Sequence, residues 1–367
     1  MKISTNRDDF LPALLQVGSV VEKRQTLPIL ANILFRVDKG LMTLLATDLE
    51  VEVRTNIKVE AEEDLEFTLP ARKIMDICKA LGDGADINLD VQGDKTVVRS
   101  GRGRYTLSTL PATDYPSMEA AVALDKIAIG QHALKRLLEK TQFAMAQQDV
   151  RYYLNGLLLE GRPGKLRAVA TDGHRLALCD VETGAEDDLA IQAIVPRKAV
   201  LELNRLLNTA DDAPEIELQF SNSHMQVVFP NSSFTTKLVD GRYPDYAKVI
   251  PTANTQELQS DKGLLKAALT RTAILSNEKF RGVRFKVEPG MLHLMAHNPE
   301  HEEAEEDMEV DYRGEELTIG FNVSYLLDVL SVLEGDTVHM GLIDATASCV
   351  ITGEDDSARY VVMPMRI

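Results

Sequence analysis

The sequence is short of the residues on which disulfide bonds, metal sites and nucleotide binding depend. Its 367 residues include only three cysteines, which are far apart and form no Cys-x-x-Cys pair. We therefore expect buried, apolar cysteines in a reducing cytoplasm, with neither disulfide nor metal. The only glycine-rich stretch of interest, Gly101–Arg104, matches neither the Walker nor the dinucleotide pattern. We expect no cofactor.

Long apolar runs are also lacking. The opening residues, MKISTNRDDF, contain no apolar stretch of the kind found in signal peptides. No segment approaches the roughly 18 uncharged apolar residues that a membrane-spanning helix needs. These absences predict a cytoplasmic protein with no membrane partner.

Positive charge is scarce as well. Lysine and arginine number 40 against 57 aspartates and glutamates, so the net charge is −17. Such a balance argues against a nucleic-acid partner, because duplex binding depends on neutralising phosphates. The total charge, however, does not say where the charges lie.

What the sequence does contain is a threefold repeat with a period near 126 residues. The helix-like run Ile74–Ile77 recurs as Val200–Leu203 and as Leu326–Val329, each copy displaced by 126 positions. This period exceeds the roughly 20–50 residues of solenoid repeats, so each unit is long enough to be a domain. We predict three like domains, which span residues 1–124, 125–253 and 254–367.

Each repeat has the same predicted order of elements. An opening strand leads into an amphipathic helix, and these helices are predicted at about residues 8–20, 131–146 and 262–275. A hairpin follows, which in the second repeat is expected to begin at Leu154, and then a strand and a second helix. An antiparallel meander closes the repeat. Helices flanked by strands favour an α+β fold, with two helices packed on antiparallel sheets.

The positive charges gather on the predicted helices. The six helical segments sum to +6, which leaves −23 for the rest of the chain. Lysine and arginine are good helix formers, which is a sufficient explanation by itself. Glutamate forms helices equally well and is scarce in these segments. Helices on one face of each domain would then present a basic surface, backed by acidic sheets, to a polyanion.

Seven stretches, in order along the whole chain, make it resemble the bacterial DNA polymerase III beta subunits, the sliding clamps. That family also has three like domains. The stretches are Thr26–Leu30, Ser108–Pro111, Gln148–Gly156, Thr171–Leu176, Lys237–Arg242, Ile274–Gly282 and Tyr360–Arg366.

The resemblance implies a non-catalytic processivity factor. Two chains would form a head-to-tail homodimer, a six-domain ring around double-stranded DNA, and tether the replicative DNA polymerase alpha subunit. An ATP-dependent clamp loader would open the ring. Other polymerases and repair proteins with clamp-binding peptides would share its binding surface.

The resemblance also implies a set of DNA contacts. Its members are Arg24, Arg72, Gln148, Tyr152 and Tyr153, and all five residue types are present. To these we add two basic residues that open a predicted helix, Arg197 and Lys198. Taken alone, the segment around Tyr152 fits equally well a strand edge with one tyrosine in the core, and Arg151 there could pair with phosphate.

In the resembled family an apolar cleft between the second and third domains holds partner peptides. The matching positions are Leu154, Thr171, Gly173, His174, Arg175, Leu176, Pro244, Lys248, Val249, Val362, Met363, Pro364, Met365 and Arg366. Methionine suits a surface that must accept different side chains. Lys248 stands where the family usually has an arginine. Lysine lacks the planar guanidinium, so the hydrogen bond that this group would donate is in doubt, whereas the apolar pocket is unaffected.

The first and third repeats carry opposite charges. Basic residues cluster in the first repeat, and seven acids lie between Glu300 and Glu309 in the third. These would steer head-to-tail closure. The expected interface comprises Lys73, Ile77, Leu81, Arg102, Arg104, Tyr105, Ile274, Leu275, Glu300, Glu302 and Glu303. The apolar members match dimer contacts of the resembled family, although Tyr105 replaces its usual phenylalanine.

Two other interpretations stay open at this point. His174 and Asp172 could form part of a nuclease or hydrolase, although no serine or cysteine nucleophile stands in a suitable turn. A clamp-like duplicate with altered partner or drug binding is the second, for which Lys248 is the only hint. His297, His301 and the acidic run suggest a metal site, but their irregular spacing and the lack of a nearby cysteine favour a solvated acidic face.

Overall fold

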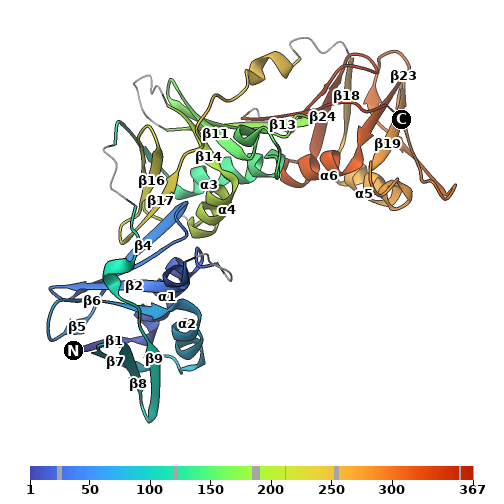
Figure 1. Cartoon of the computed structure of the whole chain (residues 1–367). Helices are drawn as coiled ribbons and strands as arrows, with labels where there is room; N and C mark the ends of the chain where they lie inside the picture. Colours follow the sequence, from blue (N-terminus) through green and yellow to red (C-terminus); the bar gives the residue numbers. More distant parts are fainter. Residues whose placement is uncertain are drawn as a thin grey trace. The chain divides into compact units, whose positions relative to one another are not determined.

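The computed structural model describes residues 1–22, 27–118, 123–183, 191–210, 212–251, 256–354 and 357–366, and in them six α-helices and 26 strands (Figure 1). All strand pairs are antiparallel, so the predicted α+β class is confirmed. The boundary expected between residues 253 and 254 lies outside the described residues. No helix in the described part of the chain is long and apolar enough to cross a membrane.

The elements follow the predicted repeat order. The helices are α1 (Arg7–Gly18), α2 (Ala71–Ala80), α3 (Gln131–Thr141), α4 (Arg197–Leu206), α5 (Lys262–Thr272) and α6 (Val323–Val332). The strands of the first repeat are β1 (Lys2–Asn6), β2 (Asn32–Asp38), β3 (Leu41–Thr47), β4 (Val51–Lys58), β5 (Glu60–Ala61), β6 (Leu65–Pro70), β7 (Asp86–Gln92), β8 (Lys95–Ser100) and β9 (Gly103–Ser108).

The second and third repeats reproduce this series. The second contains β10 (Asp125–Ile129), β11 (Gly156–Arg162), β12 (Lys165–Thr171), β13 (Arg175–Glu182), β14 (Gln192–Pro196), β15 (Ile216–Phe220), β16 (His224–Val228) and β17 (Ser232–Lys237). The third contains β18 (Gln256–Asp261), β19 (Gly282–Glu288), β20 (Met291–His297), β21 (Glu303–Glu309), β22 (Asp311–Tyr312), β23 (Leu317–Asn322), β24 (Thr337–Leu342), β25 (Cys349–Thr352) and β26 (Ala358–Val362).

Two of the four sheets run across the boundaries between repeats. In the sheet β10-β15-β16-β17-β4-β3-β2-β6, strand β17 of the second repeat pairs with β4 of the first, Phe234 opposite Val53. In the sheet β14-β11-β12-β13-β26-β25-β24-β18-β22, strand β13 pairs with β26 of the third repeat, Ala177 opposite Tyr360. The other two sheets, β5-β1-β7-β8-β9 and β21-β20-β19-β23, each belong to one repeat.

The compact units of the structure do not coincide with the three sequence repeats. The chain packs as two units: unit 1 comprises residues 1–132 and 198–238, and unit 2 comprises residues 133–197 and 239–367. The second repeat therefore contributes to both units. The physical reason is that its outer strands complete sheets that begin in the first and the third repeat.

Side-chain caps set where several helices begin. Asn6 accepts a hydrogen bond from the backbone N–H of Asp8 at 2.9 Å, and Asp261 accepts one from Leu264 at 2.7 Å. Each cap is the last residue of the opening strand of its repeat. It satisfies an amide group that the first turn of the helix leaves without a partner.

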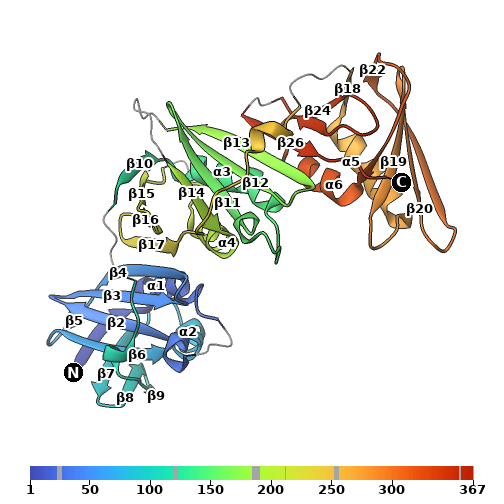
Figure 2. The same cartoon turned by 45° about the horizontal axis from the view of Figure 1, so that its top comes forward.

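In the first and third repeats, the two helices pack together and cover both sheets. In unit 1, α1 contacts α2 and strands β1, β3 and β4. In unit 2, α5 and α6 lie side by side (Figures 1 and 2) and contact both the β19–β23 sheet and the sheet that contains β18 and β26. Between the layers, stacked rings of Phe35 and Phe67, 4.9 Å apart, fill the first repeat. The edge-on pair of Phe285 and Phe321 fills the third.

The cysteines are buried as predicted. Cys78, Cys179 and Cys349 all lie in the interior. Burial raises the pKa of the Cys78 thiol to about 12 and raises that of Cys349 further. A thiol that stays protonated is a poor nucleophile and a poor metal ligand.

Four predicted bounds differ from the observed ones, three at helix ends and one at the hairpin. The helix expected to reach residue 146 ends at Thr141, whose hydroxyl donates back to the carbonyl of Leu137 at 2.8 Å. The helices expected to end at residues 20 and 275 end at Gly18 and Thr272. Leu154 does not open a strand, because it closes a turn of 3-10 helix and β11 begins two residues later.

Gly156 offers a test of the strand pairing in the second repeat. A Cβ atom there would lie 2.6 Å from the carbonyl oxygen of Val195 on β14. We expect Gly156→Ala to lower the free energy of unfolding by about 1–3 kcal/mol, because a backbone atom cannot move aside easily. Thermal unfolding followed by circular dichroism measures the change.

The matched control is Gly82→Ala, where a Cβ would meet nothing within 4 Å. We expect this variant to unfold at the wild-type temperature. Equal midpoints for the two variants would show that the close approach of β11 and β14 is not a constraint.

Candidate functional site

The segment Gln148–Tyr153, for which DNA contacts are predicted, is a loop held by its own side chains. The backbone N–H of Asp149 donates to Oδ1 of Asn155, and Nδ2 of Asn155 donates to the carbonyl of Asp149, both at 2.9 Å. Gln148 has a φ of 57°, in the left-handed region. The reciprocal pair fixes the loop without help from a ligand.

Arg151 braces this loop. Its Nε and Nη2 donate to the two carboxylate oxygens of Asp149 at 3.0 and 2.9 Å, and Nη2 also donates to the carbonyl of Asp172 at 3.2 Å. The hydrogen bonds from Arg151 lower the pKa of Asp149 to about 2. The guanidinium is engaged in these contacts, and 46% of the Arg151 side chain stays exposed.

The exposed residues of the loop are Gln148, Val150, Arg151 and Tyr152. Val150 is 95% exposed and Tyr152 is 58% exposed. Tyr153 is half-buried, packs on the apolar core of unit 2 and meets the Tyr152 ring edge-on, with centroids 5.7 Å apart. The two tyrosines therefore differ: the ring of Tyr152 is exposed, whereas that of Tyr153 is half-buried against the apolar core.

The predicted basic contacts differ in how available their charge is. Arg72 lies in the first turn of α2, is exposed, and has no ion-pair partner among the residues that the structure describes. Arg197 opens α4 and is half-buried, with Nη1 donating to the carbonyl of Met145 at 3.2 Å. Arg24 lies outside the described residues.

Lys198 is the most constrained of the described basic candidates. Its ammonium forms ion pairs with both Glu22 and Asp48 in unit 1. Burial opposes its charge, but the hydrogen bonds to Asp48 and Glu22 raise its pKa. Two carboxylates already neutralise this lysine, so it has less charge to offer a phosphate than Arg72 has.

The residues predicted to bind partner peptides all belong to unit 2, and two of them, Leu154 and Leu176, are members of one buried apolar cluster. The cluster consists of Ala146, Leu154, Leu158, Val169, Leu176, Leu178, Ile194, Tyr243, Tyr246 and Val361. Leu154 and Leu176, both predicted contacts, are 2% and 3% exposed, and Val362 is fully buried. All three of these predicted contacts are therefore buried in the unbound protein.

The loop from Thr171 to Arg175 forms one side of this surface. The backbone N–H of Thr171 donates to the hydroxyl of Tyr243 at 3.1 Å. Gly173 has a φ of +88°, and a Cβ there would lie 2.9 Å from Nη2 of Arg151. The left-handed φ favours glycine at that position. The guanidinium of Arg151, which braces the predicted DNA loop, also packs against this loop.

Arg175 is a structural tie within unit 2. Its side chain donates to Asp172 at 3.1 Å and to Asp328 of α6 at 2.5 Å, and its guanidinium lies 4.5 Å from the centre of the Tyr325 ring. With 12% of the side chain exposed, it holds β13 and α6 together and presents little surface to a peptide.

The geometry does not support His174 as a general base oriented by Asp172. Oδ1 of Asp172 accepts the backbone N–H groups of His174 and Arg175, at 2.9 and 3.1 Å, and Oδ2 accepts Nε of Arg175. The Asp172 carboxylate therefore caps the loop and does not orient the imidazole ring of His174. His174 is exposed and is free to contact a peptide.

The remaining predicted peptide contacts lie on two further segments. Pro244, Lys248 and Val249 lie on or beside a turn of 3-10 helix, and Lys248 pairs with Asp245 at 3.1 Å. The C-terminal segment continues from β26, with Met363, Pro364 and Met365 half-buried and Arg366 exposed. Backbone hydrogen bonds from Met363 to His174 (2.9 Å) and from Met365 to Gly320 (2.8 Å) hold it.

In unit 1, β9 is an edge strand that carries basic residues. Arg104 faces Arg99 of β8 directly across the sheet. Like charges in that position repel each other. Tyr105 is 40% exposed. Arg102 and Lys73 are exposed, and Ile77 and Leu81 at the end of α2 are half-buried.

In unit 2, β21 is an edge strand that carries acidic residues. Glu303 and the alternate residues after it are exposed, as are Glu300 and Glu302 before the strand. Ile274 is 74% exposed, and Leu275 beside it is half-buried. No group of three or more histidine, cysteine or acidic side chains in the described residues could hold a metal ion.

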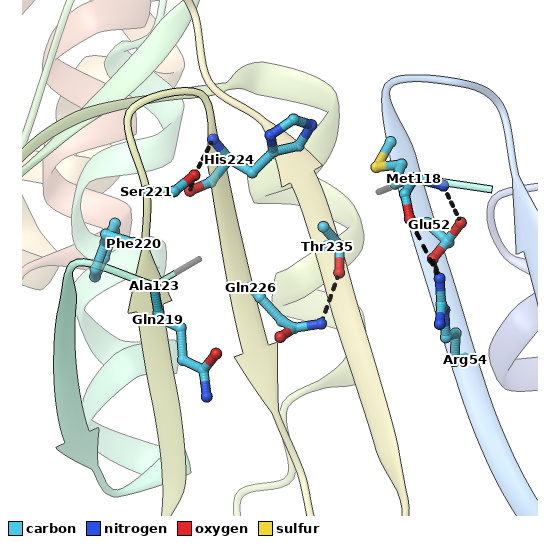
Figure 3. A pocket seen from close by; sticks show the side chains of 10 residues that line it. All are labelled: Glu52, Arg54, Met118, Ala123, Gln219, Phe220, Ser221, His224, Gln226 and Thr235. Carbon is cyan, nitrogen blue, oxygen red and sulfur yellow. Dashed lines mark hydrogen bonds and ion pairs between the residues drawn. The ribbon is translucent and has the colours of Figure 1, made fainter. Parts of the chain in front are cut away.

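A small polar cavity of about 50 Å³ lies in unit 1, where β4 meets β17, and Figure 3 shows its lining. Buried Glu52 accepts hydrogen bonds from Arg54 at 2.6 Å and from the N–H of Met118 at 2.8 Å. None of the predicted site residues lines it. The cavity follows from polar side chains at a sheet seam.

Three α+β repeats whose sheets continue from one repeat to the next define a DNA clamp. Family models agree along the chain: they describe the DNA polymerase III beta subunit, with its N-terminal domain at residues 1–119, its central domain at 128–245 and its C-terminal domain at 247–366. The chain belongs to this family, the bacterial beta sliding clamps. It is a non-catalytic processivity factor of DNA replication and a cytoplasmic protein.

Individual relatives match over their full length. The beta sliding clamps of Pseudomonas aeruginosa and Escherichia coli are 47% and 46% identical, each with all of both chains covered. The crystal structure of the DNA polymerase III subunit beta from Pseudomonas aeruginosa has a TM-score of 0.97 at 47% identity, and Caulobacter crescentus pol III beta has 0.95 at 39%, again with complete coverage of both chains.

The brace between Arg151 and Asp149 can be tested by titration. Because the folded pKa of Asp149 is about 2, below the unperturbed value of about 3.9, the brace stabilises the loop above pH ~4 and is lost as the pH falls through about 2. In Arg151→Ala we expect the pKa to return toward ~3.9. Carbon-detected NMR of the Asp149 carboxyl group measures both values.

Asp344 provides the control, because hydrogen bonds from Thr346 and Ala347 lower its pKa without any arginine. Its titration should be the same in both proteins. An Asp149 midpoint that does not move in Arg151→Ala would contradict the brace.

Proposed function

We propose that two copies of this chain close head to tail into a ring that encircles double-stranded DNA and slides along it. The observation that carries the proposal is the pair of oppositely charged edge strands, β9 and β21. An edge strand has unpaired backbone groups and invites a further strand. A heterologous interface between β9 of one chain and β21 of another closes into a ring if the rotation allows.

Charge complementarity supports that pairing. Arg99 and Arg104 oppose each other at β9, and this repulsion is relieved when an acidic strand lies alongside. Glu303 and its exposed acidic neighbours on β21 supply the opposite charge. Tyr105 on the basic edge and Ile274 near the acidic edge are exposed apolar side chains, suited to the buried centre of such an interface.

DNA contacts in the proposal are few and directed at phosphates. Arg72 and Arg197 supply charge, and Gln148 and Tyr152 supply an exposed amide and ring. Tyr153 and Lys198 hold their surroundings in place, as their packing and ion pairs support. Contacts without base readout allow sliding, because they are equally strong at every position along the duplex.

The candidate peptide surface in unit 2 would tether the replicative polymerase alpha subunit and, in turn, other polymerases, repair proteins and the clamp loader. Its buried leucines, exposed Val249 and half-buried methionines favour a short peptide with apolar anchors. Exposed His174 and Arg366 at its margin would contact the peptide backbone or polar side chains.

Ring closure predicts that topology, rather than affinity, retains the protein on DNA. After loading by a clamp loader with ATP, the protein should stay on nicked circular DNA in high salt and leave linear DNA quickly. High salt removes phosphate contacts, since each contributes about 0.9 to the log–log salt slope. Gel filtration of labelled protein with each DNA measures retention.

The control is Ile274→Asp, which places a charge on a 74% exposed position in the proposed interface. This variant should sediment as a folded monomer and leave both DNA forms equally fast. Rapid loss of the wild-type protein from circular DNA would exclude the ring.

The substitution at Lys248 tests whether this clamp has altered partner binding. The side chain is 80% exposed and its ion pair with Asp245 is solvated, so an exposed donor contributes little. We expect Lys248→Arg to change the affinity for a labelled peptide with leucine and phenylalanine anchors by less than about fivefold. Fluorescence anisotropy measures the dissociation constant.

Val249→Asp is the comparison, because it puts a charge on an apolar contact of the same turn. It should weaken the same peptide much more than Lys248→Arg changes it. A gain of tenfold or more from the arginine would instead favour a clamp-like duplicate with a partner preference of its own.

A further inference from the structure

The turn that carries Lys248 and Val249 is fastened to the second repeat by two tyrosine hydroxyl groups. Tyr243 and Tyr246 are three residues apart, and each is 8% exposed. The Tyr243 hydroxyl accepts the N–H of Thr171 at one end of β12. Tyr246 reaches the other end of the same hairpin, near the β11–β12 turn.

Tyr246 lies at the centre of a charged network. Its hydroxyl donates to Oε2 of Glu160 at 2.5 Å and accepts from Nη2 of Arg162 at 2.8 Å and from Nη1 of Arg167 at 3.4 Å. Asp180 holds Arg167 from the far side through two hydrogen bonds, at 2.6 and 2.7 Å. Every partner comes from β11, β12 or β13, the rigid sheet of unit 2.

The network keeps Glu160 ionised. Burial alone would raise its pKa, but hydrogen bonds from Tyr246 and Arg162 lower it. A carboxylate acceptor makes the tyrosine hydrogen bond stronger than one between neutral groups. The bond therefore anchors a segment that is otherwise exposed on either side, at Asp245 and at Ala247.

We propose that Tyr246 is a positioning residue for partner-peptide binding: its hydrogen bonds to Glu160, Arg162 and Arg167 hold the turn so that Val249 and Lys248 stand at the edge of the peptide surface. This inference rests on the proposed peptide-binding function. Val249 is 38% exposed and belongs to the same 3-10 turn as Tyr246. Because one turn carries both residues, a shift of the anchor also shifts the contact residue.

The test is Tyr246→Phe in the full-length protein, with the anisotropy of the leucine- and phenylalanine-bearing peptide as the readout. Glu160 and Arg162 remain paired with each other at 3.0 Å in this variant, so no buried charge loses its partner. We expect the peptide to bind about two- to tenfold more weakly, the range that the loss of one hydrogen bond covers.

Tyr115→Phe is the matched control. Tyr115 is also buried, at 6% exposure, and donates to the carbonyl of Asn32 at 3.0 Å in unit 1. Its substitution should leave peptide affinity unchanged. If Tyr246→Phe fails to fold, Glu160→Gln, which removes the acceptor's charge, should give the same loss of affinity.

A double-mutant cycle separates positioning from a general loss of structure. If Tyr246 acts through the turn, Tyr246→Phe should have no further effect when Val249→Ala is already present. Full additivity of the two effects, or wild-type affinity in Tyr246→Phe, would overturn the inference. Failure of the wild-type protein to bind the peptide would overturn the proposed peptide-binding function as well.

Discussion

The constraint on which this structure depends is that backbone groups at the edges of its sheets need partners. Strand β17 of the second repeat meets β4 of the first, and β13 meets β26 of the third, so two sheets run across the boundaries between repeats. Strands β9 and β21 are among the edge strands that this internal pairing leaves open. The fold thus joins some sheet edges within the chain, and in the proposed ring a second copy would pair with β9 and β21.

The same sheets place the candidate peptide surface. Because β13 pairs with β26, the loop before β13 and the C-terminal segment after β26 are neighbours, and Met363 bonds to the carbonyl of His174. Arg175 then ties that loop to α6 through Asp328. The predicted DNA loop joins the arrangement through Arg151, whose guanidinium reaches Asp149, Asp172 and the space beside Gly173.

The formal charge summed over the helices overstates the positive charge that is available to DNA. Within their observed bounds the six helices sum to +7, close to the +6 expected from the sequence. Much of this charge is already paired, since Lys140 bonds to Glu334, Lys198 to Glu22 and Asp48, and Arg271 to Glu306. Arg72 has no such partner among the described residues, so the available charge is smaller and more localised than the sum implies.

The sequence by itself determined the threefold repeat, the α+β class, the order of the elements and the family, because hydrophobic periodicity and local motifs are properties of neighbouring residues. It could not determine that Leu154 and Val362 are buried, that Arg151 and Lys198 are engaged in ion pairs, or that Tyr246 anchors a turn. Partners such as Glu160 and Tyr246 lie 86 positions apart. Only the tertiary structure, through strand pairing, brings such groups together and decides which of them stay available to DNA or to a peptide.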